Sequence, residues 1–139
     1  MPSIYFACSI RGGRDDAERY AELVAIIKQH ANLLTEIFAD GKLTAMGSAG
    51  KSSDIYTQDL AWVEQSDAVI AEVSSPSLGV GYEIAKAEQW GKPVLALYRN
   101  QEGKRLSAMI DGDPNVQVVH YNDVEQAEAA IKLFIKALA

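Results

Sequence analysis

The chain has 139 residues, of which 48% are hydrophobic and 23% are charged, and its formal net charge at pH 7 is -6. The length predicts one globular domain over residues 1–139, and the composition excludes a chain that stays disordered. The negative charge disfavours broad binding to polymeric nucleic acid or to an anionic membrane, because both require a positive surface.

The strands and helices expected from the sequence alternate along the chain. Apolar runs predict strands over residues 3–8, 33–39, 67–73, 93–98 and 116–121. Amphipathic stretches predict helices over residues 15–30, from an N-cap among Ser52, Ser53 and Asp54 to about residue 65, from about residue 78 to 90 before Gly91, and over 123–138. Residues 40–53 have no usable period and indicate a mobile loop.

This alternation is typical of βαβ units and predicts an α/β fold. We expect a flavodoxin-like, doubly wound sheet of five parallel strands in the order 2-1-3-4-5. Ligands of such sheets bind beyond the carboxyl ends of the strands where the order reverses, here strands one and three.

The single cysteine, Cys8, cannot form a disulfide within the chain, and no charged and apolar leader opens the sequence. No apolar run approaches the roughly 18 residues that a membrane helix needs. We therefore expect a soluble protein of the cytoplasm.

Two Ser/Gly-rich turns follow the first and third predicted strands. The first contains Arg11, Gly12, Gly13 and Arg14, and suits a phosphate cradle because glycines let the backbone approach an anion near a helix N-terminus. A tight turn with two solvated arginines explains the same spacing. The second turn runs over residues 74–83, so two turns that suit an anion would face one crevice.

Three carboxylates lie close to these strand ends. Glu83 is expected in the first turns of its helix, where the helix dipole favours the ionised form, although complementing the dipole could be its whole role. Asp59 falls on the apolar stripe of its helix, which fits a catalytic carboxylate or a buried salt bridge. Glu72 is expected on the strand face opposite Ala71 and Val73, as a supporting residue.

Other polar residues have simpler explanations. His30 and His120 are not tied to a nucleophile by any known pattern, so neither indicates a triad or a metal site. Residues 111–114 lack the regularly spaced oxygen ligands of an EF-hand and indicate a surface turn.

Several motifs recur in the order known from one family. They are Ile4-Tyr5-Phe6, the run from Cys8 to Arg14, Gln58-Asp59-Leu60, Pro76 to Glu83 and Leu106 to Ile110. From residue 4 to about residue 121 the chain resembles the 2′-deoxynucleoside 5′-phosphate N-hydrolases, which belong to the nucleoside 2-deoxyribosyltransferase superfamily.

The resemblance implies cleavage of the bond between base and sugar in 2′-deoxynucleoside 5′-monophosphates, without a cofactor or metal. It makes Glu83 the nucleophile, which forms a glycosyl ester, Asp59 the second catalytic carboxylate, and Tyr5 the hydroxyl that positions or tunes Glu83. A homodimer with shared active sites is also implied. The implied nucleotide contacts are Cys8, Ser9, Ile10, Arg11, Gly12, Gly13, Arg14, Ser77 and Gly79, with Ser107, Ala108 and Met109 from a neighbouring subunit.

Ile37 departs from the family pattern, in which a histidine lies close to the nucleotide, so the preferred base stays open. A nucleoside 2-deoxyribosyltransferase would form the same intermediate, but it would not need Arg11 and Arg14 for a phosphate. A ribonucleotide hydrolase of the CMP type would share the cradle. A noncatalytic flavodoxin-like module is the remaining alternative, although the acidic cluster of a phosphorylated receiver is missing after strand one.

Overall fold

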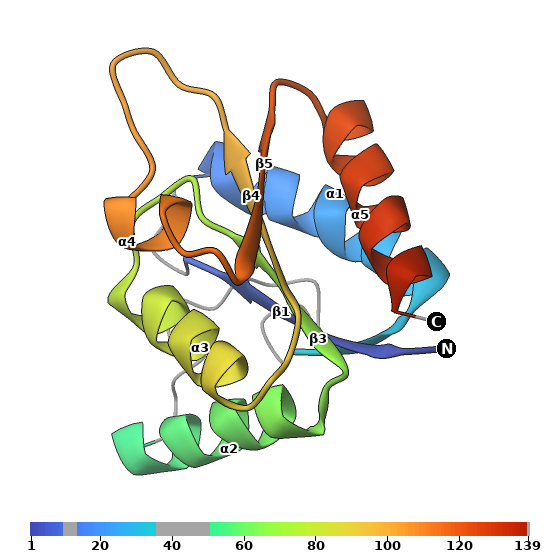
Figure 1. Cartoon of the computed structure of the whole chain (residues 1–139), viewed down its shortest axis with the longest axis vertical. Coiled ribbons are helices and arrows are strands. Elements are labelled where there is room, and N and C mark those ends of the chain that lie inside the picture. Colours follow the sequence, from blue (N-terminus) through green and yellow to red (C-terminus); the bar gives the residue numbers. More distant parts are fainter. Residues whose placement is uncertain (10–13, 36–50, 139) are drawn as a thin grey trace.

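The computed structural model describes residues 1–9, 14–35 and 51–138 (Figure 1). Its five parallel strands form one sheet in the order β2-β1-β3-β4-β5, which confirms the predicted α/β flavodoxin-like fold. The strands are β1 (Ser3–Cys8), β2 (Asn32–Leu34), β3 (Ala68–Glu72), β4 (Val94–Arg99) and β5 (Val116–Tyr121). The helices are α1 (Arg14–His30), α2 (Ser52–Gln65), α3 (Leu78–Gln89), α4 (Ala108–Asp111) and α5 (Val124–Ala137).

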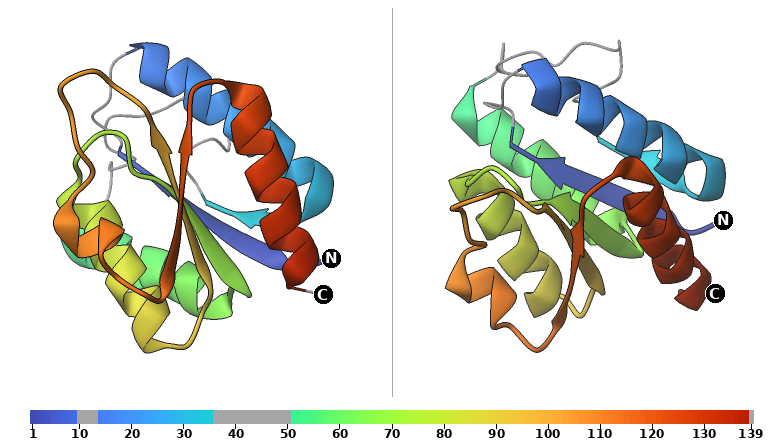
Figure 2. Two further views of the ribbon diagram at one scale, coloured as in Figure 1. Left: turned by 45° about the horizontal axis from the view of Figure 1, so that its top comes forward. Right: turned by 90° about the horizontal axis from the view of Figure 1, so that it is seen from above.

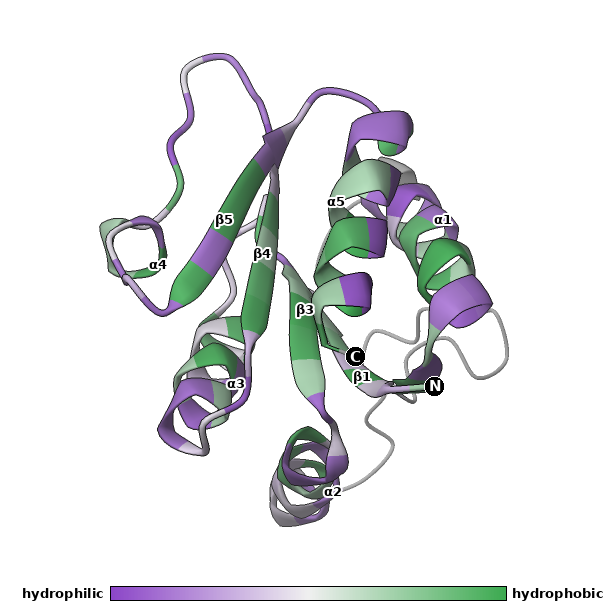
Figure 3. Cartoon of the chain, turned by 45° about the vertical axis from the view of Figure 1, so that its right-hand side comes forward, coloured by the Kyte–Doolittle hydropathy of each residue, from purple (hydrophilic) through white to green (hydrophobic). Residues whose placement is uncertain are grey.

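Helices cover both faces of the sheet, with α1 and α5 on one face and α2 and α3 on the other (Figure 2). Successive side chains of a strand point to opposite faces. Ile4 and Phe6 of β1 therefore pack against α1 and α5, whereas Tyr5 and Ala7 pack on the side of α2 and α3. Figure 3 shows the hydrophobic colour concentrated on the strands and on the side of α5 that faces them. None of the helices within the described ranges is long and apolar enough to cross a membrane.

Helix α3 has well-defined ends that place Glu83 in its second turn. The Ser77 side chain caps the N-terminus by accepting a hydrogen bond from Val80 N–H at 3.2 Å. At the C-terminus Gly91 has φ 73°, and Lys92 N–H donates to the Ala87 carbonyl at 2.8 Å. This is the Schellman arrangement, in which glycine adopts the left-handed conformation at low cost.

The structure corrects three details of the predicted elements. The N-cap of α2 is Lys51, because its carbonyl accepts from Asp54 and Ile55 N–H, so Ser52 is already helical. Strand β2 begins at Asn32 and ends at Leu34; residues 36–50, including most of the predicted loop, lie outside the described part. Helix α4 was not predicted, because its four residues are too few to show a helical period.

The N-cap of α5 offers a stability test away from the carboxyl ends of the central strands. Asp123 accepts a hydrogen bond from Gln126 N–H at 2.9 Å. Asp123→Ala is expected to cost about 1 kcal/mol, because one helix donor loses its partner, and to lower the Tm by about 3 °C in a thermal melt. Asp123→Ser keeps a capping oxygen and should melt like the parent protein; an equal loss in both variants would contradict the capping role.

Candidate active site

Tyr5 and Glu83, which are far apart in the sequence, meet beside the centre of the sheet. The Tyr5 hydroxyl donates a hydrogen bond to Glu83 Oε2 at 2.6 Å. Tyr5 comes from β1 and is 3% exposed, and Glu83 is half-buried in α3. Burial, together with the charge of Glu83, raises the pKa of Tyr5 well above its ordinary value, so the phenol keeps the proton that it donates.

Asp59 of α2 lies close to this pair. Its carboxylate is half-buried, and its charge raises the pKa of both Tyr5 and Glu83. Coulomb interactions weaken with distance and with exposure to water, so this effect of Asp59 on both groups requires proximity. The structure therefore gathers the three side chains that the resemblance makes catalytic from β1, α2 and α3.

The Glu83 carboxyl titrates close to neutral pH. Burial raises its pKa to about 7; the hydrogen bond from Tyr5 acts in the opposite direction, and the charge of Asp59 raises it further. The helix dipole was expected to favour the ionised form, but burial has the larger effect on the pKa, and Glu83 is the sixth residue of α3, beyond the first turn where the dipole mainly acts. A carboxyl near neutrality can serve as a nucleophile above that pH and as an acid below it.

This raised pKa predicts a pH-dependent gain in stability for Glu83→Gln. The folded-state pKa lies above the unfolded value, so the native protein loses stability as pH rises from about 4.5 to about 7. At pH 8 the variant should melt a few degrees higher than the parent, by about 2–4 °C, and at pH 4 the two should melt alike. Glu128→Gln, which breaks a surface pair with Lys132 on α5, is the control. A gain that does not depend on pH would contradict the assignment.

The remaining expected contacts lie only in part within the described residues. Ile10, Arg11, Gly12, Gly13 and Ile37 lie outside them. Cys8 and Ser9 are buried at the end of β1, and α1 begins at Arg14. Burial, with the charges of Glu72 and Glu83, raises the Cys8 pKa well above its ordinary value. Ser77 is the N-cap of α3 and Gly79 lies in its first turn, and the carboxyl ends of β1 and β3, at Cys8 and Glu72, lie side by side.

A cleft of about 620 Å³ opens on another side of α3. Its lining includes Gly81, Ile84 and Glu88 of α3, which form one stripe of the helix, whereas Glu83 lies on a different side. Ser107 and Met109 line the same cleft from the start of α4. Within one chain, the segment 107–109 therefore lies across α3 from the Tyr5–Glu83 pair.

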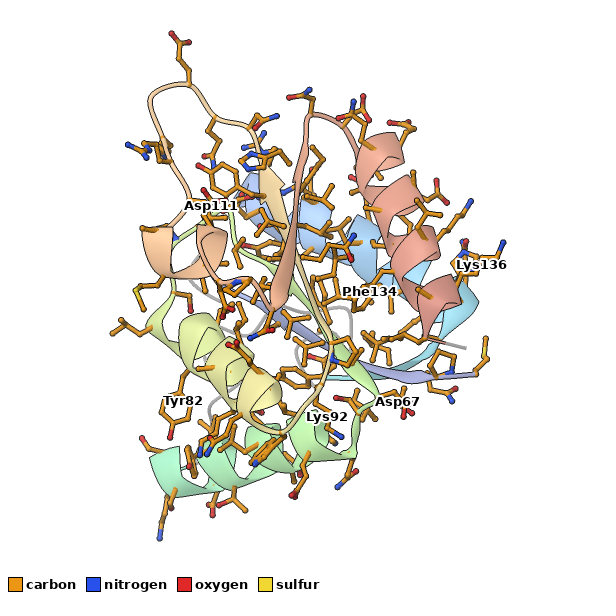
Figure 4. The ribbon with its side chains drawn as sticks, viewed as in Figure 1. Asp67, Tyr82, Lys92, Asp111, Phe134 and Lys136 are labelled. Carbon is orange, nitrogen blue, oxygen red and sulfur yellow. The ribbon has the colours of Figure 1, made fainter. Side chains whose placement is uncertain are left out.

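Two sets of contacts were not predicted: the contact between Tyr56 and Tyr82, and the partners of Glu72 on the opposite face of the sheet. Tyr56 of α2 and Tyr82 of α3 stack edge to face with ring centroids 5.9 Å apart, and their hydroxyl oxygens are 3.3 Å apart. Figure 4 shows Tyr82 projecting from α3 toward α2. Glu72 was expected only as a supporting residue on the face away from Ala71 and Val73; that face is confirmed, and the carboxylate belongs to a buried cluster with Arg19.

His120 and Asp113 each have a structural contact with a neighbouring residue. His120 Nδ1 lies 3.0 Å from Asn100 Oδ1, and its ring stacks edge to face on Tyr98. Asp113 accepts from Asn115 N–H at 2.9 Å, as in a surface turn. Among the described side chains, no group of three or more His, Cys, Asp or Glu residues is placed to hold a metal ion.

Comparison with known proteins identifies the family. The nucleoside 2-deoxyribosyltransferase family model matches residues 4–130. The chain is 44% identical to a 5-hydroxymethyl-dUMP N-hydrolase of Mus musculus, over 97% of this chain and 80% of the relative. It is 43% identical to the 5-hydroxymethyl-dUMP N-hydrolase of Homo sapiens, over 91% of this chain and 74% of the relative.

A solved structure shares the fold. The conserved protein from Enterococcus faecalis V583 superposes with a TM-score of 0.77 at 24% identity, over 96% of this chain and 99% of that one. Together with the family model, which covers most of the sequence, these matches leave one assignment. The chain belongs to the nucleoside 2-deoxyribosyltransferase family.

Proposed function

We propose that this chain is an N-glycosidase that hydrolyses 2′-deoxynucleoside 5′-monophosphates to the free base and 2-deoxyribose 5-phosphate. The observation that carries the proposal is the buried Tyr5–Glu83 hydrogen bond of 2.6 Å, with Asp59 close enough to act on both groups. Enzymes that cleave glycosidic bonds usually place two carboxylates around the reacting carbon. The names of the relatives support hydrolysis of a deoxynucleotide.

In the first step, ionised Glu83 attacks C1′ of the sugar. The bond from C1′ to the base nitrogen breaks, its electron pair stays with the base, and an ester forms between C1′ and a Glu83 oxygen. Tyr5 holds Oε2, which orients the other oxygen, Oε1, for attack. The departing base takes up a proton from solvent water, while Asp59 stays ionised beside the reacting centre.

In the second step, water releases the sugar. The water oxygen attacks C1′, the ester bond breaks, and its electron pair returns to Glu83 as a carboxylate. Asp59 accepts the proton that the water loses and releases it to solvent, which restores both groups to their starting states. Because the charge that develops on the sugar is positive, a 2′-hydroxyl would destabilise it, and deoxy substrates are favoured.

The starts of α1 and α3 form the proposed phosphate site. Both helices begin beyond the carboxyl ends of adjacent parallel strands, β1 and β3, and helix N-termini attract anions through free N–H groups. Ser77 and the exposed Gly79 lie at the start of α3. Arg11 and Arg14 in the sequence before and at the start of α1 would add positive charge.

We also propose that a second copy of the chain completes the site. Leu78 and Met109 beside the large cleft are 96% and 82% exposed, which is unusual for large apolar side chains and typical of an interface. A partner seated there could bring its own segment 107–109 to this chain's Glu83. Shared active sites in a homodimer follow from that arrangement.

Met109→Lys tests the dimer. The residue is already exposed, so the variant should fold, sediment as a monomer and lose activity by about tenfold or more, because the partner no longer supplies part of the site. Leu133→Lys, at a residue 69% exposed on α5, is the matched control and should leave both the mass and the activity unchanged. A parent protein that is monomeric and fully active would contradict the proposal.

Product analysis tests the reaction itself. The protein is incubated with 5-hydroxymethyl-dUMP, dGMP, dCMP, GMP and deoxyguanosine, each with and without a second free base, and the products are separated by chromatography. We expect free base and 2-deoxyribose 5-phosphate from a deoxynucleotide, whether or not a second base is present. A new nucleotide formed with the added base would indicate transfer to a base, and release from GMP at an equal rate would contradict the preference for deoxy sugars.

A further inference from the structure

A buried charged cluster lies on the face of the sheet opposite to Glu83. Its centre is Glu72 at the end of β3, which is 0% exposed, and beside it Arg19 of α1 is 7% exposed. Burying charged groups is costly unless each finds partners. The contacts of Glu72 therefore indicate what the cluster holds in place.

Glu72 binds the connection between β3 and α3. Ser74 N–H donates to Oε1 at 2.8 Å, and the Ser74 hydroxyl donates to Oε2 at 2.8 Å. The Tyr121 hydroxyl at the end of β5 also donates to Oε2. Burial and the charge of Glu72 raise the pKa of Tyr121, so this hydroxyl keeps its proton. The carboxylate thus fixes Ser74, two residues further along the chain, in the connection that leads into α3.

Arg19 extends the cluster to the start of α1. Its Nε lies 3.6 Å from Glu72 Oε2, and its Nη2 lies 2.7 Å from Asp16 Oδ1. The Ser75 hydroxyl donates to Asp16 Oδ2 at 3.1 Å. The contacts close a ring from Glu72 through Arg19 and Asp16 to Ser75 and back along the chain. That ring ties the first turn of α1 to the residues just before the N-cap of α3.

We propose that Glu72 is a positioning residue that sets the separation between the starts of α1 and α3, and through it the affinity for the 5′-phosphate of the substrate. The inference rests on the proposed function, which places the phosphate between these two helix starts. Glu72 points to the α1 and α5 face, whereas Tyr5 and Glu83 lie on the other, so Glu72 acts on binding and not on the reacting carbon. The charge of Arg19 is already matched by Glu72 and Asp16, which makes it part of this frame.

Glu72→Gln separates this role from a purely structural one. Glutamine keeps the size and one acceptor oxygen but removes the charge that faces Arg19. For the nucleotide that proves active, KM should rise by about tenfold while kcat changes by less than about threefold, because the loss concerns binding alone. The inhibition constant for inorganic phosphate should rise by the same factor as KM.

Ser75→Ala provides a second, milder test, because it removes only the last contact of the ring at a half-buried surface position. It should raise KM and the phosphate inhibition constant by about threefold, which is the change expected when one weak hydrogen bond is lost. Ser66→Ala is the matched control: it removes a buried hydroxyl bonded to the Val63 carbonyl at 2.7 Å, outside the ring, and should leave KM unchanged.

A fall in kcat with KM unchanged in Glu72→Gln and Ser75→Ala, or an equal rise in KM in Ser66→Ala, would overturn the positioning role. A parent protein that cleaves nucleotide and nucleoside equally well and is not inhibited by phosphate would instead refute the phosphate site of the proposed function, and this inference with it. If Glu72→Gln does not fold, the comparison of Ser75→Ala with Ser66→Ala decides.

Discussion

Glu83→Gln is expected to lower the rate of base release by at least about 10³-fold, because the amide cannot form the ester with C1′ and cannot balance the positive charge of the sugar. The substitution keeps the shape of the side chain and an oxygen for the Tyr5 hydroxyl, so the nucleotide should still bind. Product formation followed by chromatography under single-turnover conditions measures the loss.

Glu128→Gln makes the same chemical change on α5, far from Tyr5 in the fold, and should retain full activity. Circular dichroism spectra of both variants should match that of the parent. If Glu83→Gln kept more than about a tenth of the parent rate, a loss of only about 1.4 kcal/mol in transition-state stabilisation, the nucleophile would have to be sought elsewhere.

Tyr5→Phe and Asp59→Asn are expected to move the acid limb of the pH–rate profile in opposite directions. The Tyr5 hydrogen bond lowers the Glu83 pKa and the Asp59 charge raises it from its position in α2. Tyr5→Phe should therefore shift the acid limb of kcat/KM to higher pH, and Asp59→Asn should shift it to lower pH, each by about one pH unit.

The two variants should also differ in the rate at the plateau. Asp59→Asn is expected to lower the plateau rate by about 10²-fold or more, because a group that transfers protons is lost. Tyr5→Phe removes an orienting hydrogen bond and should lower the plateau rate by about tenfold. Tyr98→Phe, a buried tyrosine of β4, is the control for loss of a hydroxyl. Shifts of the same sign in Tyr5→Phe and Asp59→Asn would show that Glu83 is not the group that titrates.

The fold could be predicted from the sequence because its signals are local and repeated. Strands β1 and β5 lie where the apolar runs place them, and Gly91 ends α3 as expected of a glycine with positive φ. The short helix α4 could not be predicted from periodicity, since it is one turn capped by Ser107. Its backbone depends on tertiary context more than on local pattern.

The candidate site was harder to predict from the sequence than the fold. Spacing alone cannot bring Tyr5 to Glu83, which are 78 positions apart; the motif resemblance named both, and the alternation of β1 explains why Tyr5 faces α3. The direction of the Glu83 pKa shift was missed, because burial is a property of the folded chain. The partners of Glu72 were missed for the same reason, although Asp16 and Arg19 at an (i, i+3) spacing were a visible signal.

The most direct test of the central claim is to trap the covalent intermediate. The protein is mixed with the active nucleotide, quenched with acid within the first turnover, digested, and examined by peptide mass spectrometry. We expect the peptide that contains Glu83 to gain the mass of one 2-deoxyribosyl 5-phosphate group, with fragmentation placing the group on that side chain. A burst of free base with no modified peptide, or a modified peptide that carries the sugar on Asp59, would contradict the account.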